Sequence, residues 1–159
     1  MPGSQVPDGA MKLWSALYLA IWIVFLEILL GLWPDPPAVV PYLHLALGFG
    51  VVLVTYSCFA GLRGTRVPAR VKRIAKASYS LSILMVVLGF LLWFNVGTTW
   101  VLPLVDVSFY RAVMLLHVAN ALAIITQMAA AAIAYDMWED HDFEKESESG
   151  HVPPPIPAQ

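Results

Sequence analysis

Residues 112–135 read AVMLLHVANALAIITQMAAAAIAY, a run of 24 residues that contains no Asp, Glu, Lys or Arg. A helix needs about 20 apolar residues to cross the hydrocarbon core of a bilayer. The run is continuous rather than alternating, which disfavours a β-barrel strand. A helix also satisfies its backbone hydrogen bonds internally, as lipid requires. The segment therefore predicts a membrane-spanning helix.

Three more apolar segments of similar length precede this one. They lie at residues 13–33, 41–62 and 77 to about 100. Only the first of them holds a formally charged residue, Glu27. The 159-residue chain is 59% hydrophobic and 13% charged, whereas soluble domains are about 25% charged. The composition excludes most soluble folds and predicts an all-α integral membrane protein, built as a four-transmembrane-helix bundle.

The charges outside these segments predict the orientation of the chain. Six of the nine Lys and Arg residues lie within residues 63–76, between the second and third segments. The positive-inside rule predicts that this loop is cytoplasmic, and with four spans both termini lie on the same side. We therefore expect a multi-pass protein of the plasma (inner) membrane.

Three parts of the chain follow from this arrangement. Residues 1–12 form a short N-terminal segment, and residues 13–135 form the four-helix membrane domain. Residues 136–159 hold seven of the eleven acidic residues and end in a proline-rich stretch. Such a composition is typical of a disordered tail, and we expect this tail in the cytoplasm.

Polar side chains inside the predicted spans gather near one end of the bundle. His44 lies three residues past the start of the second span, and His117 lies six residues past Arg111 in the fourth. Both spans run from the outside to the inside, so both histidines are expected in the outer leaflet. Glu27 and Asn95 lie near the outer ends of the first and third spans. Because ionisable residues at membrane depth are costly, this clustering predicts one functional site.

The sequences around the two histidines resemble each other. Residues 43–52 read LHLALGFGVV, and residues 116–125 read LHVANALAII. Histidine aligns with histidine, and Gly48 aligns with Ala121. The repeat is consistent with a duplicated helical hairpin whose pseudo-twofold axis lies along the membrane normal. Such an axis would suit one planar cofactor held between the two imidazoles.

Two neutral imidazoles facing each other suit the axial positions of heme iron. Gly48, Gly89 and Ala121 would let a flat ring approach the helix backbones, and Arg111 would pair with propionates at the outer surface. The chain has no Cys-x-x-Cys-His sequence, which excludes c-type attachment and leaves one heme b per chain. Zinc is the weaker alternative because it takes four ligands.

Glu27 has two interpretations that the sequence leaves open. It could carry a proton, or orient a histidine through the second ring nitrogen of that histidine. It could equally be structural, as the partner of Arg111 in a salt bridge or as a protonated side chain near the interface. Each single histidine also has a structural alternative, which is a hydrogen bond to a neighbouring helix.

Four features follow one another along residues 41–135. They are His44 ahead of a glycine-containing helix, the basic loop, Leu88-Gly89, and Leu116-His117. In this order they resemble one half of the heme A synthase family. The resemblance implies a four-helix half with a histidine near the start of its second and fourth helices, a bound heme, and half-length members that act as oligomers.

The chain departs from that family where the reaction takes place. Pro41 and Leu45 stand where the catalytic half carries a glutamate and an arginine. The extracellular cysteine pair found in many members is absent, since Cys58 is the one cysteine in the chain. The sequence therefore resembles the cofactor-holding half more than the reactive half.

Three functions follow, and whether the chain is an enzyme stays open among them. The first is a bis-histidine cytochrome b that passes single electrons to a quinone or to a respiratory-complex partner. Two axial imidazoles leave no open iron position, which favours electron transfer over oxygen chemistry. The second is a half-size heme A synthase-like oxidoreductase that acts on heme O as a homo-oligomer. The third is a non-redox structural subunit of a membrane complex. Nucleic acid is not an expected partner.

Overall fold

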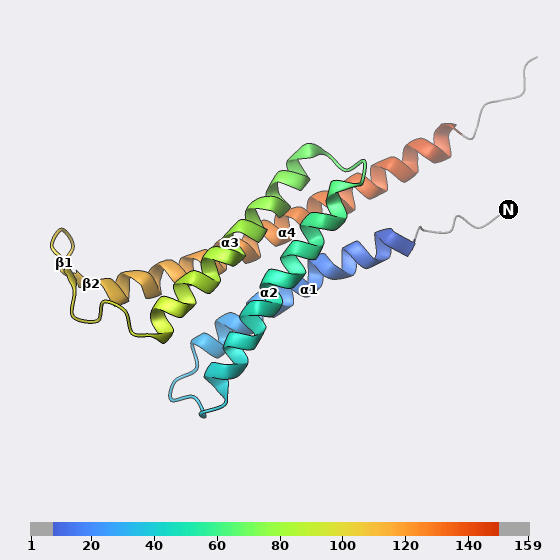
Figure 1. Cartoon of the computed structure of the whole chain (residues 1–159). Coiled ribbons are helices and arrows are strands. Elements are labelled where there is room, and N and C mark those ends of the chain that lie inside the picture. Colours follow the sequence, from blue (N-terminus) through green and yellow to red (C-terminus); the bar gives the residue numbers. More distant parts are fainter. Residues whose placement is uncertain (1–7, 150–159) are drawn as a thin grey trace, which may run out of the picture.

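A computed structural model describes residues 8–149, with side chains from residue 13 to residue 142 (Figure 1). Four helices and one short β-hairpin make up this part of the chain. They are α1 (Asp8–Gly31), α2 (Val40–Arg63), α3 (Ala69–Trp93), β1 (Val101–Leu102), β2 (Val107–Ser108) and α4 (Phe109–Ser149). The two strands pair antiparallel.

The helices form an up-down-up-down bundle. Each helix packs against the next one along the chain, and α1 packs against α4. As a result α2 and α4 lie on one diagonal of the bundle, and α1 and α3 lie on the other. All four helices contain segments long and apolar enough to cross a membrane. The prediction of an all-α bundle of four such helices is confirmed.

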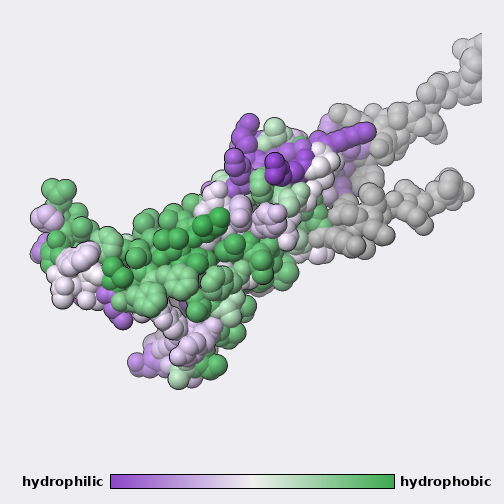
Figure 2. Space-filling model, viewed as in Figure 1, coloured by the Kyte–Doolittle hydropathy of each residue, from purple (hydrophilic) through white to green (hydrophobic). Residues whose placement is uncertain are grey.

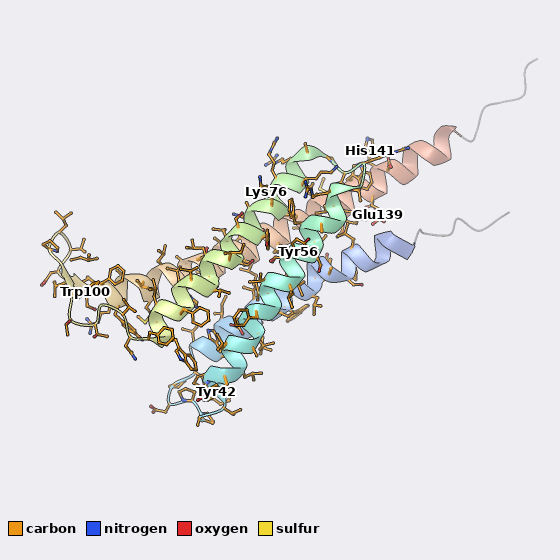
Figure 3. The ribbon with its side chains drawn as sticks, viewed as in Figure 1. Tyr42, Tyr56, Lys76, Trp100, Glu139 and His141 are labelled. Carbon is orange, nitrogen blue, oxygen red and sulfur yellow. The ribbon has the colours of Figure 1, made fainter. Side chains whose placement is uncertain are left out.

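The two ends of the bundle differ in character. The end that carries residues 64–68, between α2 and α3, is named the basic end because the Arg- and Lys-rich segment lies there. The opposite end, with residues 32–39 and 94–108, is named the histidine end. Figure 2 shows hydrophilic side chains gathered at the basic end and a hydrophobic surface over the middle of the bundle. In Figure 3, Lys76, Glu139 and His141 lie toward the basic end, whereas Tyr42 and Trp100 lie at the histidine end.

The third helix lies earlier in the chain than the sequence predicts. It begins at Ala69, inside the basic segment, because Pro68 stands at its N-cap and proline favours a helix start. It ends at Trp93 rather than near residue 100. Asn95 and Gly97 follow with φ of 54° and 74°, a left-handed conformation that stops a helix. The expectation of Asn95 inside a span is therefore wrong, since Asn95 lies in the turn that leads to the β-hairpin.

The fourth helix continues beyond the predicted membrane domain. It runs to Ser149, so the prediction of disorder is wrong for residues 136–149. The first turn of this extension is held by side chains: Trp138 packs against the core, and the Tyr18 hydroxyl donates to Asp136 Oδ2 over 3.1 Å. Residues 150–159, with the proline-rich stretch, lie outside the described residues.

The two helical hairpins bury side chains at matching positions. Adding 58 to a residue number of α1 gives the matching position in α3, and adding 73 to a number of α2 gives the matching position in α4. The buried pairs in α1 and α3 are Leu13/Val71, Leu17/Ala75, Ala20/Ser78, Val24/Ser82 and Leu30/Leu88. The buried pairs in α2 and α4 are Val40/Val113, Val51/Ile124, Thr55/Met128, Cys58/Ala131 and Leu62/Tyr135. The second offset is the one that aligns His44 with His117.

Polar side chains in the middle of the bundle are paired between helices. Thr55 and Ser82 hydroxyls lie 2.9 Å apart, and the Ser78 hydroxyl donates to Gln127 Oε1 over 3.2 Å. Asn120 Nδ2 donates to the backbone carbonyl of Leu81 over 2.9 Å. These bonds link α3 to α2 and to α4, and each contributes about 0.6 kcal/mol on average in a membrane bundle.

Candidate functional site

The two membrane-depth histidines meet across the diagonal of the bundle. His44 projects from α2 and His117 from α4, and their ring centroids are 6.2 Å apart with an angle of 55° between the ring planes. Both side chains are half-buried. The two histidines lie at different distances from the starts of their spans, but this does not keep the two rings apart. The structure therefore brings together the two residues that the sequence singles out.

Glu27 belongs to the same cluster. It comes from α1, is only 5% exposed, and places Oε2 at 2.9 Å from His44 Nδ1. Glu27 Oε1, the other carboxylate oxygen, has no hydrogen-bond partner among the described residues. Of the two partners that the sequence allows for Glu27, the structure has His44. Arg111 is exposed on the first turn of α4.

A glycine faces each histidine ring. A Cβ placed on Gly31 would lie 3.5 Å from Cε1 of His44, and a Cβ placed on Gly89 would lie 3.5 Å from Cε1 of His117. The two glycines are 58 residues apart, so they occupy matching positions of α1 and α3. Sequence reasoning found Gly89 and missed Gly31. The repeat between the hairpins is the signal that could have found Gly31.

The matching position of Glu27 in α3 is Met85. The backbone of Met85 contacts His117, as Glu27 contacts His44, but Met85 offers no carboxylate. His117 Nδ1 is buried and without a hydrogen-bond partner in the described structure. The two rings therefore contact matching helix positions, Glu27 and Met85. These positions differ in charge, because the acidic side chain lies on the His44 side.

A cavity of about 300 Å³ lies beside both rings. Its inner wall includes Glu27, His44, His117 and Ala121. Gly48 adjoins this wall, since a Cβ there would lie 3.9 Å from Glu27 Oε2. The remaining lining residues are mostly apolar and come from all four helices and from the connection between α1 and α2: Ile28, Leu30, Gly31, Leu32, Trp33, Pro36, Val40, Pro41, Leu92, Tyr110, Met114 and Val118.

The spacing of the two rings fits the coordination of one metal ion between them. Metal–imidazole bonds of about 2.0 Å on either side of an ion place two ring centroids about 6 Å apart. Leaving a buried polar nitrogen without a partner costs about 1–3 kcal/mol. Two imidazoles, with a carboxylate against one of them and apolar walls with small residues, thus form a donor set that fits a planar metal cofactor.

Substitution of the two glycines tests whether they set the position of the rings. Alanine at either site is expected to be tolerated, because its Cβ would make an ordinary contact of 3.5 Å with the imidazole. Leucine is expected to displace the ring and to cost about 1–3 kcal/mol through overpacking. The measurement is the affinity for hemin of Gly31→Leu and Gly89→Leu, with each alanine variant as its control. Equal affinities of the leucine and alanine variants would contradict the contact.

No family model matches the chain, and no curated protein or solved structure is significantly similar to it. The resemblance to the heme A synthase family stays a prediction, and the function has to be argued from the residues at the histidine end.

Proposed function

We propose that the chain is a membrane-embedded b-type heme protein that transfers single electrons, with His44 and His117 as the two axial ligands of one heme iron. The observation that carries the proposal is the pair of imidazoles from diagonal helices, 6.2 Å apart between ring centroids. In the structural alternative, the histidines would serve only packing, with their ring nitrogens hydrogen-bonded to neighbouring helices. Here His44 Nδ1 lies 2.9 Å from Glu27 Oε2, an arrangement that suits a carboxylate orienting a metal-binding imidazole.

Other residues of the cluster would hold and orient such a group. Glu27, against His44 Nδ1, would fix the ring and raise its basicity as a ligand. Gly31 and Gly89 would leave the rings free of side-chain crowding. Heme supplies a reversible one-electron couple when bound, and the apolar lining of the cavity would exclude water from it.

The outer surface of the site would carry the propionates. Arg111 is exposed at the start of α4, one residue after Tyr110, which lines the cavity. Arg111 does not itself line the cavity, so its pairing with a propionate remains an expectation of the sequence. The electron partner would be a quinone or a respiratory-complex subunit that approaches the histidine end.

We also propose that the bundle is a duplicated hairpin. The matched burial of α1 with α3 and of α2 with α4 supports a pseudo-twofold axis between the histidines. Heptad-like packing alone would give similar patterns at several offsets. The offsets of 58 and 73 are favoured because they also align Gly31 with Gly89 and His44 with His117.

The proposed location is the plasma (inner) membrane, with the basic end in the cytoplasm. Arg63, Arg66, Arg70 and Lys72 gather at that end, which supports this orientation through the positive-inside rule. Both described termini of the chain, at residues 8 and 149, lie toward the same end (Figure 1). The heme would then lie in the outer half of the bilayer.

Purification after expression with ample heme tests the proposal directly. We expect one heme b per chain, measured by pyridine hemochrome analysis, and a sharp reduced-minus-oxidised α band typical of bis-histidine ligation. Extraction of the pigment would separate heme b from heme O or heme A. A folded protein that stays colourless after addition of hemin would contradict the proposal and would favour a structural subunit.

A further inference from the structure

The cavity beside the histidines reaches the surface of the bundle between α1 and α4. Its mouth is formed by Leu32, which directly follows α1 and is 65% exposed, and by Met114 and Val118 on α4, which are 43% and 38% exposed. Glu27 and Ala121 are buried in its inner wall. All three side chains at the mouth are apolar, so the opening suits contact with hydrocarbon.

The opposite seam, between α2 and α3, is closed at the same level by aromatic rings. Tyr42 and Trp93 pack edge to face with ring centroids 5.6 Å apart. Phe49 and Phe90 pack in the same way at 6.3 Å. Each pair joins one ring from α2 to one from α3, so the two helices are bridged near their histidine ends.

Because the two hairpins repeat, the seam between α2 and α3 can be compared position by position with the seam between α1 and α4. Under the offsets that align the histidines, Tyr42 corresponds to Leu115, Phe49 to Leu122 and Phe90 to Leu32. The four aromatic residues of the closed seam therefore have no aromatic counterpart in the seam between α1 and α4. Two seams with matching backbones differ in the side chains that would block a large, flat ligand.

The approach along the bundle axis is lined by apolar side chains, of which Trp33 is 52% exposed. Trp33 and Pro36, from the connection between α1 and α2, and Val40 and Pro41, from the start of α2, line the cavity on the side of the histidine end. The lining thus presents apolar groups toward the outer water phase. On the side that would face lipid it reaches exposed side chains of α4 and of Leu32, just after α1.

We infer that heme reaches the two histidines from the lipid phase, sideways through the seam between α1 and α4; this rests on the heme site proposed above. The ligand is a planar apolar macrocycle dissolved in the outer leaflet rather than heme carried in water. A cavity of about 300 Å³ is at the lower end of small-molecule pockets, which span about 300–1,000 Å³. The seam must therefore widen as the macrocycle passes, and its width controls the rate of uptake.

Heme uptake by the full-length apoprotein in lipid vesicles tests the inference. Hemin is supplied either from donor vesicles of the same lipid or bound to serum albumin in water, and the Soret absorbance is followed with time. Val118→Trp narrows the mouth and is expected to slow uptake from vesicles about tenfold; rates are compared after scaling each variant to its own final heme content. Leu116→Trp, on the same helix but outside the cavity lining, is the matched control and is expected to keep the wild-type rate.

Opening the closed seam gives a second, independent measurement. Tyr42→Ala combined with Trp93→Ala is expected to speed uptake from vesicles and to restore the rate of Val118→Trp. Unchanged rates in both the narrowed and the opened variants would overturn the inference, as would faster uptake from albumin than from vesicles. A wild-type protein that binds no heme at equilibrium would instead contradict the heme site itself, so the two failures are distinguishable.

Discussion

Replacing His44 with alanine is expected to abolish stoichiometric heme binding, and replacing His117 with alanine is expected to do the same. Each variant removes one of the two proposed axial ligands and leaves the other imidazole in a half-buried site. We expect the heme content of the purified protein to fall by at least about tenfold. Any residual pigment should show the spectrum of a single-imidazole complex. The measurements are heme stoichiometry and the absorption spectra of both redox states.

The residues directly before the histidines provide matched controls. Leu43 and Leu116 are exposed on the surfaces of α2 and α4, so alanine at either position should leave heme content unchanged. Added imidazole should partly restore the bis-imidazole spectrum in His44→Gly, because it can occupy the volume of the lost side chain. The proposed ligation is excluded if both single alanine variants keep full heme content and an unaltered spectrum.

The membrane spans could be predicted because each is an unbroken run of apolar residues about as long as the bilayer is thick. The ends of the helices could not be predicted, because they depend on local backbone conformations and not on hydropathy. Asn95 and Gly97 adopt left-handed φ values, and the chain therefore leaves α3 at Trp93 although the following residues are still largely apolar. The acidic segment after Tyr135 reads as disordered by composition, yet packing of Trp138 on the core continues the helix.

Some residues of the candidate site could likewise be predicted from the sequence, and others could not. His44, His117 and Glu27 could be found because an ionisable residue in an apolar span is conspicuous at any rotation of its helix. The partner of Glu27 could not, because the sequence does not record how α1 is rotated and packed against α2 and α4, and this decides between His44 and Arg111. Gly31 is the last residue of α1 and resembles an ordinary helix end. Its role depends on the packing of α1 against α2.

Replacing Glu27 with methionine is expected to raise the midpoint potential of the heme. This substitution makes the His44 side of the cluster resemble the His117 side, where Met85 occupies the matching position. Beside an axial imidazole, this carboxylate would lie about 7 Å from a bound iron and would interact with its extra positive charge by about 2 kcal/mol at an effective dielectric constant of about 20. That energy corresponds to an upward shift on the order of 100 mV when the charge is removed. Potentiometric titration of the purified protein measures the shift.

Met85→Leu is the control, because it changes the matching position without altering charge and should leave the potential near that of the wild type. Glu27→Gln separates charge from contact, since it keeps the shape of the side chain and should move the potential in the same direction as methionine. Loss of the carboxylate should also weaken heme binding about 10–100-fold, as removal of a group that orients a metal ligand does. A potential and an affinity that stay at wild-type values in Glu27→Met would show that the carboxylate does not act on the heme through His44.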